Sequence, residues 1–332
     1  MNAQSKSNLR GALFALLAFG LFSTHDVIVK VLGSSYAPFQ IVFFSVLLSF
    51  PLVMLMLMRD STRGTLIPAH PWWTAARTIA VIITATCAFY AFSVLPLAEV
   101  YAILFAMPLM ITILSIPVLG ERVGLHRWGA VIVGLCGVLV VLRPGTASLS
   151  LGHLSALMAA VGGAVASIIV RRIGKDERNA VLLLYPMMAN FVIMGALMPV
   201  YYNPMPALDL GLLAIMAILA FSGTLCVIQA YKAGDAALVA PMQYSQILWA
   251  AGFGAIFFSE SIDPMTGLGA AIIILSGVYV VIREAIGGRS DNRPVLETRS
   301  RPETGTTPRV GAVLMRNAAA SAPSHESLAK KS

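Results

Sequence analysis

The stretch LRGALFALLAFGLFSTHDVIVKVLG (residues 9–33) returns in altered form as SLGHLSALMAAVGGAVASIIVRRIG (residues 150–174). With Leu9 aligned on Ser150, eight of the 25 aligned pairs are identical, and Lys30 is matched by Arg171. Each stretch is apolar for about 20 residues, the length that crosses the hydrocarbon core of a bilayer as a helix. Both halves of the chain therefore begin with the same kind of membrane-spanning unit.

The duplication extends beyond these first helices. Cys87 and Glu121 recur as Cys226 and Glu260. Four more residues recur in almost the same alignment, since Gly129, Gly137, Val138 and Arg143 match Gly269, Gly277, Val278 and Arg283. Chance similarity between helices rich in Ala, Leu and Gly explains single matches, but not a nearly constant offset along the chain. We therefore expect two repeats, 1–147 and 148–287. The segment that follows, 288–332, is polar and rich in Arg, Ser, Pro and Ala, and it is expected to be a disordered cytoplasmic tail.

Composition places the chain in lipid. Hydrophobic residues make up 58% of the 332 residues and charged residues only 11%, whereas a soluble chain carries about 25% charged residues. So few charges cannot cover a surface that faces water. Nucleic-acid binding, disulfide-bonded secreted domains and cytosolic enzymes are therefore excluded.

Ten apolar runs are long enough to span a bilayer, and they are too long for barrel strands. The predicted spans are 10–32, 38–58, 72–94, 97–119, 124–142, 152–171, 179–201, 208–231, 236–258 and 264–283. The predicted fold class is an all-α polytopic membrane protein with ten transmembrane helices, arranged as two inverted five-helix repeats. The repeats are inverted because five is odd, so the second repeat crosses the membrane in the opposite sense.

Lys and Arg residues predict the orientation. With the N-terminus inside, 20 of the 23 basic residues fall in inner segments, and the exceptions are Lys30, Arg77 and Arg143. We therefore predict an integral inner-membrane protein with both termini in the cytoplasm. A signal peptide at the N-terminus is a weaker alternative, because the apolar run resumes after Asp26 and no small-x-small cleavage site follows.

The segment FYAFSVLPLAEVYAILFAMPLMITILSIPVLGERVGLHRWGAVIVGLCGVLVVLRPG (residues 89–145) carries a distinctive series of motifs. They are Pro96-Leu97-Ala98-Glu99, Pro108, Leu119-Gly120-Glu121, Trp128-Gly129 and Gly137-Val138. Together with the spans and repeats, they resemble the drug/metabolite transporter superfamily, specifically its ten-helix EamA-type branch, over residues 9–284. Asp26, Lys30 and Arg77 also match positions that this branch often fills. Ser45 departs from the pattern, because the family often has Arg there, and a substrate contact through that Arg is in doubt.

The resemblance implies a secondary active transporter that moves a small polar or zwitterionic, amino-acid-like metabolite by alternating access. Because the sequence has no ATP-binding motif, we expect coupling to a gradient or to exchange. We expect no enzymatic activity, cofactor or nucleic-acid partner; the partners are the substrate and membrane lipid, and a homodimer is left open. A membrane receptor or scaffold and an intramembrane enzyme remain the alternative classes.

Charged residues inside the spans are the first functional candidates. Asp26 is a candidate site for a proton or a substrate amine, and the alternative is a structural ion pair with Lys30, one turn farther along the same face. Arg77 is a candidate for binding a carboxylate or phosphate. Its alternative is to snorkel beside the interfacial Trp72 and Trp73.

Other titratable groups have structural interpretations. His25 points about 100° away from Asp26 around a helix, so we do not expect these neighbours to form a functional pair. Glu99 is expected to face water at the start of its span. Glu121 and Glu260 recur in both repeats and are expected to cap the helices that follow them.

Uncharged polar residues near mid-membrane indicate a shared cavity. With Asp26 and Arg77, the substrate-binding candidates are Thr24, Asn190, Gln243, Tyr244 and Gln246. For each residue the alternative is a polar contact that holds two helices together. Three prolines are expected to bend helices beside the cavity, Pro108, Pro186 and Pro241. No metal site is expected, because the three cysteines lie alone in separate spans.

Overall fold

The computed structural model describes residues 3–58, 65–121, 123–144, 149–174, 176–233 and 239–286. Its helices are α1 (Ala3–Gly33), α2 (Pro38–Met58), α3 (Pro71–Val94), α4 (Leu97–Leu104), α5 (Met107–Leu119), α6 (Leu125–Leu142), α7 (Leu151–Ile173), α8 (Asn179–Tyr201), α9 (Ala207–Ala233), η1 (Ala240–Tyr244), α11 (Ser245–Phe258) and α12 (Pro264–Ile286). The predicted tail, 288–332, lies outside the described residues.

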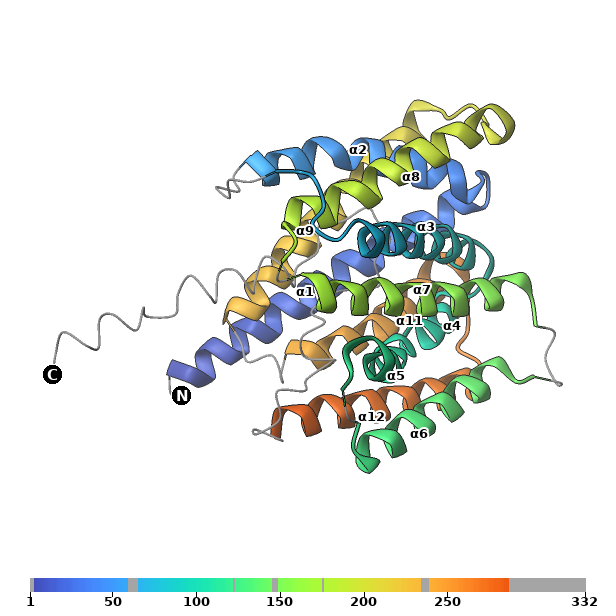
Figure 1. Cartoon of the computed structure of the whole chain (residues 1–332). Coiled ribbons are helices and arrows are strands. Elements are labelled where there is room, and N and C mark those ends of the chain that lie inside the picture. Colours follow the sequence, from blue (N-terminus) through green and yellow to red (C-terminus); the bar gives the residue numbers. More distant parts are fainter. Residues whose placement is uncertain are drawn as a thin grey trace, which may run out of the picture.

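These helices make ten crossings of the bundle. Within the described ranges, nine stretches are long and apolar enough to span a membrane, and α4 and α5 together form one of them. The tenth crossing consists of η1 and α11, which follow one another without a break. The start of α1 and the end of α12 lie on the same side of the bundle (Figure 1). We call this the terminal side and the opposite one the far side.

The packing of the helices repeats between the two halves. α1 packs against α9, and their counterparts in the other half, α7 and α3, pack against each other. α2 contacts its own counterpart α8, and α6 contacts its own counterpart α12. α1 and α7 run in opposite directions across the bundle (Figure 1). A two-fold axis in the membrane plane produces this exchange of partners, so the predicted all-α fold with two inverted repeats is confirmed.

Two predicted spans are interrupted. The fourth span divides into α4 and α5, and the ninth begins as the 3-10 helix η1. Pro108 lies in the first turn of α5; it has no N–H to donate to the carbonyl of Leu104, where α4 ends, and its ring would clash there. Pro241 lies at the start of η1. By contrast, α8 continues through Pro186.

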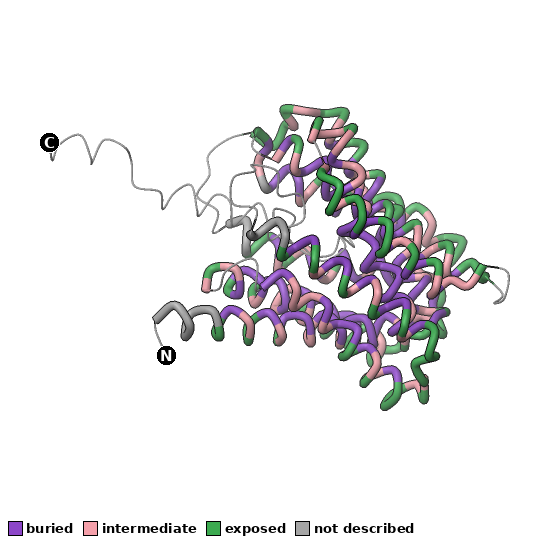
Figure 2. The backbone as a smooth tube through the Cα atoms, turned by 90° about the horizontal axis from the view of Figure 1, so that it is seen from below, coloured by how far each residue is buried: buried purple, intermediate pink, exposed green. Residues whose placement is uncertain are grey.

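The outside of the bundle is apolar. Figure 2 shows buried residues turned toward the interior of the bundle and exposed residues on its outer faces. Leu248, Ile256 and Leu275 on the outer faces are each at least 70% exposed. Such a surface suits hydrocarbon, because lipid tails compete for no hydrogen bonds and the backbone bonds are satisfied within the helices.

Glycine lets α6 and α12 approach closely. A Cβ atom at Gly269 would lie 2.7 Å from the carbonyl oxygen of Gly137 and 3.0 Å from the backbone nitrogen of Val141. These are backbone atoms, which cannot swing aside as the end of a flexible side chain can. Small residues at such crossings are how membrane helices gain packing contacts without a hydrophobic driving force.

We expect Gly269→Ala to destabilise the purified protein in detergent by about 1–3 kcal/mol, the usual cost of overpacking. The measurement is the thermal unfolding temperature. Gly267→Ala in the same helix is the matched control, because its Cβ would meet only Ile262 Cγ2 at 3.6 Å, an ordinary contact. Equal unfolding temperatures for the two variants would contradict the close crossing of α6 and α12.

Candidate functional site

A buried polar cluster surrounds Asp26 in α1. Its Oδ1 lies 2.7 Å from Nδ1 of His25, and its Oδ2 accepts a hydrogen bond from the hydroxyl of Tyr101 in α4. Gln246 in α11 donates from Nε2 to the Tyr101 oxygen at 3.4 Å. Ser23 Oγ lies 3.5 Å from the same oxygen. Each of these five side chains is at most 3% exposed, and together they are called the Asp26 cluster below.

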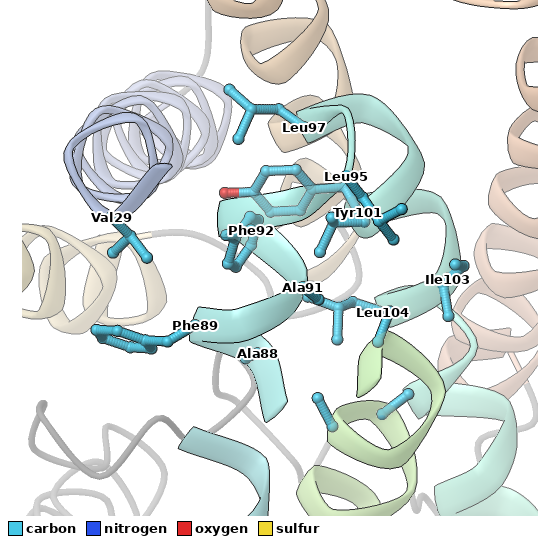
Figure 3. Close-up of a cluster of buried hydrophobic side chains, with 14 of the residues drawn as sticks. Val29, Ala88, Phe89, Ala91, Phe92, Leu95, Leu97, Tyr101, Ile103 and Leu104 are labelled. Atoms are coloured by element: carbon cyan, nitrogen blue, oxygen red, sulfur yellow. The ribbon is translucent and has the colours of Figure 1, made fainter. Parts of the chain in front are cut away.

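The interrupted helices place the groups of this cluster. Tyr101 lies in the last turn of α4, just before the break, and Gln246 lies in the first turn of α11, just after η1. α1 packs against α11, η1 and α3, and it presents Asp26 to both groups. Figure 3 shows the hydroxyl of Tyr101 pointing from α4 toward α1. Discontinuous helices of this kind form the binding sites of many secondary transporters.

Aromatic rings enclose the cluster. The ring of Phe92 packs edge-on against Tyr101 at 5.4 Å between centroids, and Phe89 packs in the same way against the His25 ring at 6.2 Å. Figure 3 shows Phe92 of α3 beside Tyr101, and Phe89 of the same helix farther away, near Val29 of α1. A carboxylate in such surroundings is costly unless its oxygens are hydrogen-bonded. Both oxygens of Asp26 have partners, so an incoming cation has to compete with His25 or Tyr101.

The contacts of Lys30 and His25 differ from those that their positions on α1 indicate. Lys30 does not pair with Asp26, since its Nζ lies 2.7 Å from Oε1 of Glu260 and donates to the carbonyl of Leu95. The long lysine side chain reaches a second carboxylate beyond the helix end, whereas the short side chain of Asp26 is held by nearer partners. His25 does pair with Asp26. Their side chains leave the helix about 100° apart, but rotation about the side-chain bonds brings the ring nitrogen and the carboxylate together.

The prediction that Glu99 faces water is wrong. Its Oε1 lies 2.8 Å from Nε2 of His153, and the side chain is only 18% exposed. The partner comes from the start of α7, in the other repeat, so the local sequence around Glu99 gave no sign of it.

Neither repeated glutamate caps the helix that follows it, contrary to our prediction. Glu121 pairs with Arg171 at 2.7 Å. Glu260 pairs with Lys30 and accepts the N–H of Leu97 at the start of α4, at 3.0 Å. α12 is capped instead by Asp263, which accepts two N–H groups of its first turn. A strong positive partner within reach outweighs a cap at the next helix end.

Arg77 is turned inward and does not snorkel. Its side chain is 3% exposed, and Nη1 donates to the carbonyl of Leu182 in α8. Trp72 is 87% exposed, and the Trp73 ring lies 4.9 Å from the guanidinium carbon of Arg172 instead. Arg77 lies near the start of α3, toward the terminal side, and a role in substrate binding stays a prediction.

The other predicted residues do not gather around Asp26. Thr24 Oγ1 donates to the carbonyl of Gly20 in its own helix at 2.9 Å. The hydroxyl of Tyr244 would lie 1.8 Å from a Cβ atom at Gly277, so this side chain points toward α12. Gln243 is partly exposed on η1. Of the predicted amides, only Gln246 joins the Asp26 cluster in the described part of the chain.

Asn190 is a separate buried polar group. It is 0% exposed, and within the described residues neither its Oδ1 nor its Nδ2 has a hydrogen-bond partner. Its neighbour Phe191 stacks on Phe43 of α2 with 5.0 Å between ring centroids. An unpartnered amide in apolar surroundings costs about 1–3 kcal/mol. Asn190 is therefore still a candidate for binding a polar group that enters the bundle.

An open groove of about 460 Å³ lies between α6 and α12. Residues of both helices line it, among them His126, Leu275 and Tyr279. It contains none of the predicted substrate-binding residues, and its walls are mostly apolar. The groove therefore belongs to the outer surface of the bundle and not to the Asp26 cluster.

Tyr101 is not among the residues predicted from the sequence, and His25 is predicted to point away from Asp26. The available signal for Tyr101 was a phenol inside a predicted span, because a buried tyrosine hydroxyl needs a hydrogen-bond partner. For His25 it was the cost of burying an imidazole in hydrocarbon without a partner. Neither signal names the partner: Tyr101 reaches Asp26 from another helix, and His25 reaches it by rotation of its own side chain.

Both halves of the chain match the same family model. The EamA-like transporter family matches residues 9–143 and again residues 149–283. The chain belongs to the EamA-like transporter family. The predicted family is thus confirmed, and each match covers one five-helix repeat. The repeat boundaries at 147 and 287 stay a prediction.

Curated relatives of the chain are transporters. An S-adenosylmethionine uptake transporter of Rickettsia felis is 27% identical over 287 residues, or 86% of this chain and 96% of that one. The pseudopaline exporter CntI of Pseudomonas aeruginosa is 26% identical over 268 residues, 80% of this chain and 94% of that one. A riboflavin transporter of Rhizobium johnstonii is 24% identical, over 82% of this chain and 91% of that one.

A solved crystal structure shares the fold. It is 18% identical in sequence and superposes with a TM-score of 0.55, covering 85% of this chain and 100% of that chain. Together with the membrane-spanning helices, these likenesses establish an integral membrane transporter of the EamA-like family.

Removing the Tyr101 hydroxyl should weaken the cluster measurably. We expect Tyr101→Phe to destabilise the protein in detergent by about 1–3 kcal/mol, because it leaves a buried carboxylate oxygen without its donor. In a double-mutant cycle with Asp26→Asn, the loss of stability in the double variant should differ from the sum of the two single losses by about 0.5–3 kcal/mol. The measurement is the thermal unfolding of the wild type, both single variants and the double variant.

Thr24→Val is the control for this cycle, because the threonine only donates to a carbonyl of its own helix. Its stability should stay within about 0.5 kcal/mol of the wild type. Strictly additive losses for Tyr101→Phe and Asp26→Asn would show that the two side chains do not interact.

Proposed function

We propose that the protein is a secondary active transporter for a small polar or zwitterionic, amino-acid-like metabolite in the inner membrane. It works by alternating access, with both termini in the cytoplasm. The observation that carries the proposal is the Asp26 cluster, a carboxylate held inside a membrane bundle of two inverted repeats. Charge inside a membrane domain is rare and costly, and it marks substrate and proton pathways.

The geometry of the cluster supports binding of a cation. A proton or a substrate ammonium group that reaches Asp26 takes the place of a hydrogen bond from Tyr101 or His25. Tyr101 belongs to α4 and is hydrogen-bonded to Gln246 of α11. A change of partner at Asp26 therefore alters contacts of one discontinuous helix in each repeat. Binding at Asp26 is therefore linked to the packing of the two repeats, as alternating access requires.

The named relatives support the substrate class in part. S-adenosylmethionine carries the amino and carboxylate groups of an amino acid, and the amino group suits a carboxylate such as Asp26. The riboflavin transporter, at 24% identity, shows that a relative with another kind of substrate is nearly as similar. The relatives are named for uptake and for export, so the proposal includes no direction.

The orientation rests on the basic residues. Arg171, Arg172 and Arg178 lie at the terminal-side ends of α7 and α8. Positive residues flanking membrane helices favour the cytoplasmic side. We therefore propose that the terminal side faces the cytoplasm. No observation in the described part of the chain favours an enzyme or a receptor, and a homodimer remains a prediction.

The substrate class is tested by thermal stabilisation of the purified protein in detergent. The probes are the common amino acids, S-adenosylmethionine and riboflavin. A ligand of the folded state at 100 times its Kd stabilises by about 2.7 kcal/mol. We expect at least one compound with an amino-acid moiety to raise the unfolding temperature. Stabilisation by riboflavin alone would overturn the substrate class.

The role of Asp26 is tested in proteoliposomes with the compound that stabilises the protein. If Asp26 takes the coupling proton, Asp26→Asn loses uptake driven by a pH gradient but keeps exchange of labelled for unlabelled substrate. If it binds the substrate ammonium group, both activities fall. Full gradient-driven uptake by Asp26→Asn would refute both roles.

Ser167→Ala is the matched control. Ser167 occupies the position of Asp26 in the second repeat, in the alignment that matches Lys30 with Arg171, and it is equally buried in α7. We expect this variant to keep both gradient-driven uptake and exchange.

A further inference from the structure

An ion pair ties the far-side end of α1 to the second repeat. Lys30 Nζ lies 2.7 Å from Glu260 Oε1, in the connection between α11 and α12. The other oxygen of Glu260 accepts the N–H of Leu97, the first residue of α4. The ammonium group also lies 5.2 Å from the centre of the Phe258 ring. The pair thus joins the end of α1 to two connections on the far side, α3–α4 and α11–α12.

A second ion pair does the same on the terminal side. Arg171 Nη2, at the end of α7, lies 2.7 Å from Glu121 Oε1, in the connection between α5 and α6. The neighbouring Arg172 donates to the carbonyl of Val118 at the end of α5. The side chains of Arg171 and Glu121 are only 5% and 14% exposed.

The two pairs are related by the internal repeat. Lys30 corresponds to Arg171, and Glu121 corresponds to Glu260, in the alignment of the two halves of the sequence. Lys30 of the first repeat pairs with a glutamate of the second, and Arg171 of the second repeat pairs with a glutamate of the first. The same inter-repeat bond is therefore present twice, once on each side of the bundle.

The backbone presents both glutamates in the same way. Gly120 and Ser259, which precede them, have φ of +71° and +54°, in the left-handed region. In both turns the backbone N–H of the glutamate donates a hydrogen bond to the carbonyl oxygen six residues earlier. The distance is 3.3 Å from Glu121 to Ser115 and 3.0 Å from Glu260 to Gly254. This is a helix-ending turn that glycine favours. Ser259 adopts the same left-handed conformation although it is not a glycine.

A second set of contacts obeys the same symmetry. On the far side, the Tyr36 hydroxyl donates to Asp209, and this bond raises the pKa of the Tyr36 phenol. On the terminal side, Glu177 accepts the backbone N–H of His70 at 2.6 Å. Tyr36 corresponds to Glu177, and His70 to Asp209, in the alignment of the repeats. Both ends of the bundle are thus fastened by related pairs of elements.

We propose that Lys30–Glu260 and Arg171–Glu121 are the two gates of the transport cycle. Opening the far side breaks the first pair and keeps the second, and opening the terminal side does the reverse. This inference rests on the proposed transport function. Both pairs are formed in the structure, which is therefore closed at both gates.

The position of each pair suits a gate. Asp26 lies four residues before Lys30 on the same face of α1, which is about 6 Å along the helix axis. Tyr101 lies four residues after Leu97, whose N–H is bonded to Glu260. The far-side pair therefore covers the Asp26 cluster one helical turn beyond it. On the terminal side, Ser167 lies one turn inside Arg171 in the same way.

The symmetry has an energetic consequence. Each opening breaks one partly buried ion pair of the same kind, so the two pairs add similar costs to the two openings. A ligand with modest differential affinity can then shift the population from one to the other. Neutralising one pair should favour opening of the bundle on the side of that pair and disfavour opening on the opposite side.

Labelling of single cysteines tests the two gates in membrane vesicles. The background replaces Cys87, Cys136 and Cys226 by alanine. Ala98→Cys, beside Leu97, reports the far gate, and Ser167→Cys reports the terminal gate. A membrane-impermeant maleimide is applied from each side in vesicles of known orientation.

We expect Lys30→Gln to speed labelling of Ala98→Cys from the far side and to slow labelling of Ser167→Cys from the terminal side. Arg171→Gln should have the opposite effects. The ratio of the two rates should change on the order of fivefold or more in each direction. The charge-swapped doubles, Lys30→Glu with Glu260→Lys and Arg171→Glu with Glu121→Arg, should move the ratio back toward that of the background protein.

Glu99→Gln is the matched control. Glu99 and His153 also join the two repeats on the far side, at 2.8 Å and similar exposure. The residue that aligns with His153 in the first repeat is Ala12, so this pair has no counterpart on the terminal side. Its loss should leave the labelling of Ser167→Cys unchanged.

Three outcomes would overturn the gates. If Lys30→Gln changes only the labelling of Ala98→Cys, the pair is a local fastening with no coupling to the other side. If the swapped doubles label fast from both sides, the pairs hold the fold and do not gate it. Labelling needs no substrate, so it stays decisive if the proposed substrate class fails. Transport with unresponsive labelling would refute the gates alone.

Discussion

A charge inside hydrocarbon must be paired, and the structure of this protein depends on where the partners come from. Asp26 and Lys30 are one helical turn apart in α1, yet each takes a partner from another element of the bundle. Tyr101 of α4 serves Asp26, and Glu260 after α11 serves Lys30. Because these partners lie on separate elements, the charges hold the bundle together at defined points, and movement of the helices has to exchange or break these bonds.

The polar contacts at the two ends of the bundle are matched between the repeats, whereas those at its centre are not. Lys30 and Glu260 are matched by Arg171 and Glu121, and the turns that present the glutamates are also matched. The position of Asp26 is filled by Ser167 in the second repeat. This division fits a transporter with alternating access, which needs two similar exits but only one site for the coupling ion or substrate.

Prolines mark the two interrupted crossings that bring polar groups to the centre of the bundle. Pro108 divides the fourth crossing and Pro241 begins the ninth as a 3-10 helix. The interruptions place Tyr101 and Gln246 beside α1, deep in the bundle. Pro186 has no such effect, because α8 continues through it. A proline therefore marks where a helix can be interrupted, and the neighbouring helices decide whether the backbone uses it.

The sequence by itself determined the spans, the two inverted repeats and the family. Span length and repeat offset are properties of the chain alone, since a bilayer of fixed thickness demands about 20 apolar residues from each helix. It also marked Asp26 and Lys30 as charges inside a span, and left open an ion pair between them because of their spacing in one helix. Only the tertiary structure decided the partners of Asp26 and Lys30. Long side chains reach across helices, and a charged group bonds most strongly with the oppositely charged or polar group that helix packing places beside it. For the same reason the tertiary structure separated Gln246, which joins the Asp26 cluster, from Thr24 and Tyr244, which do not.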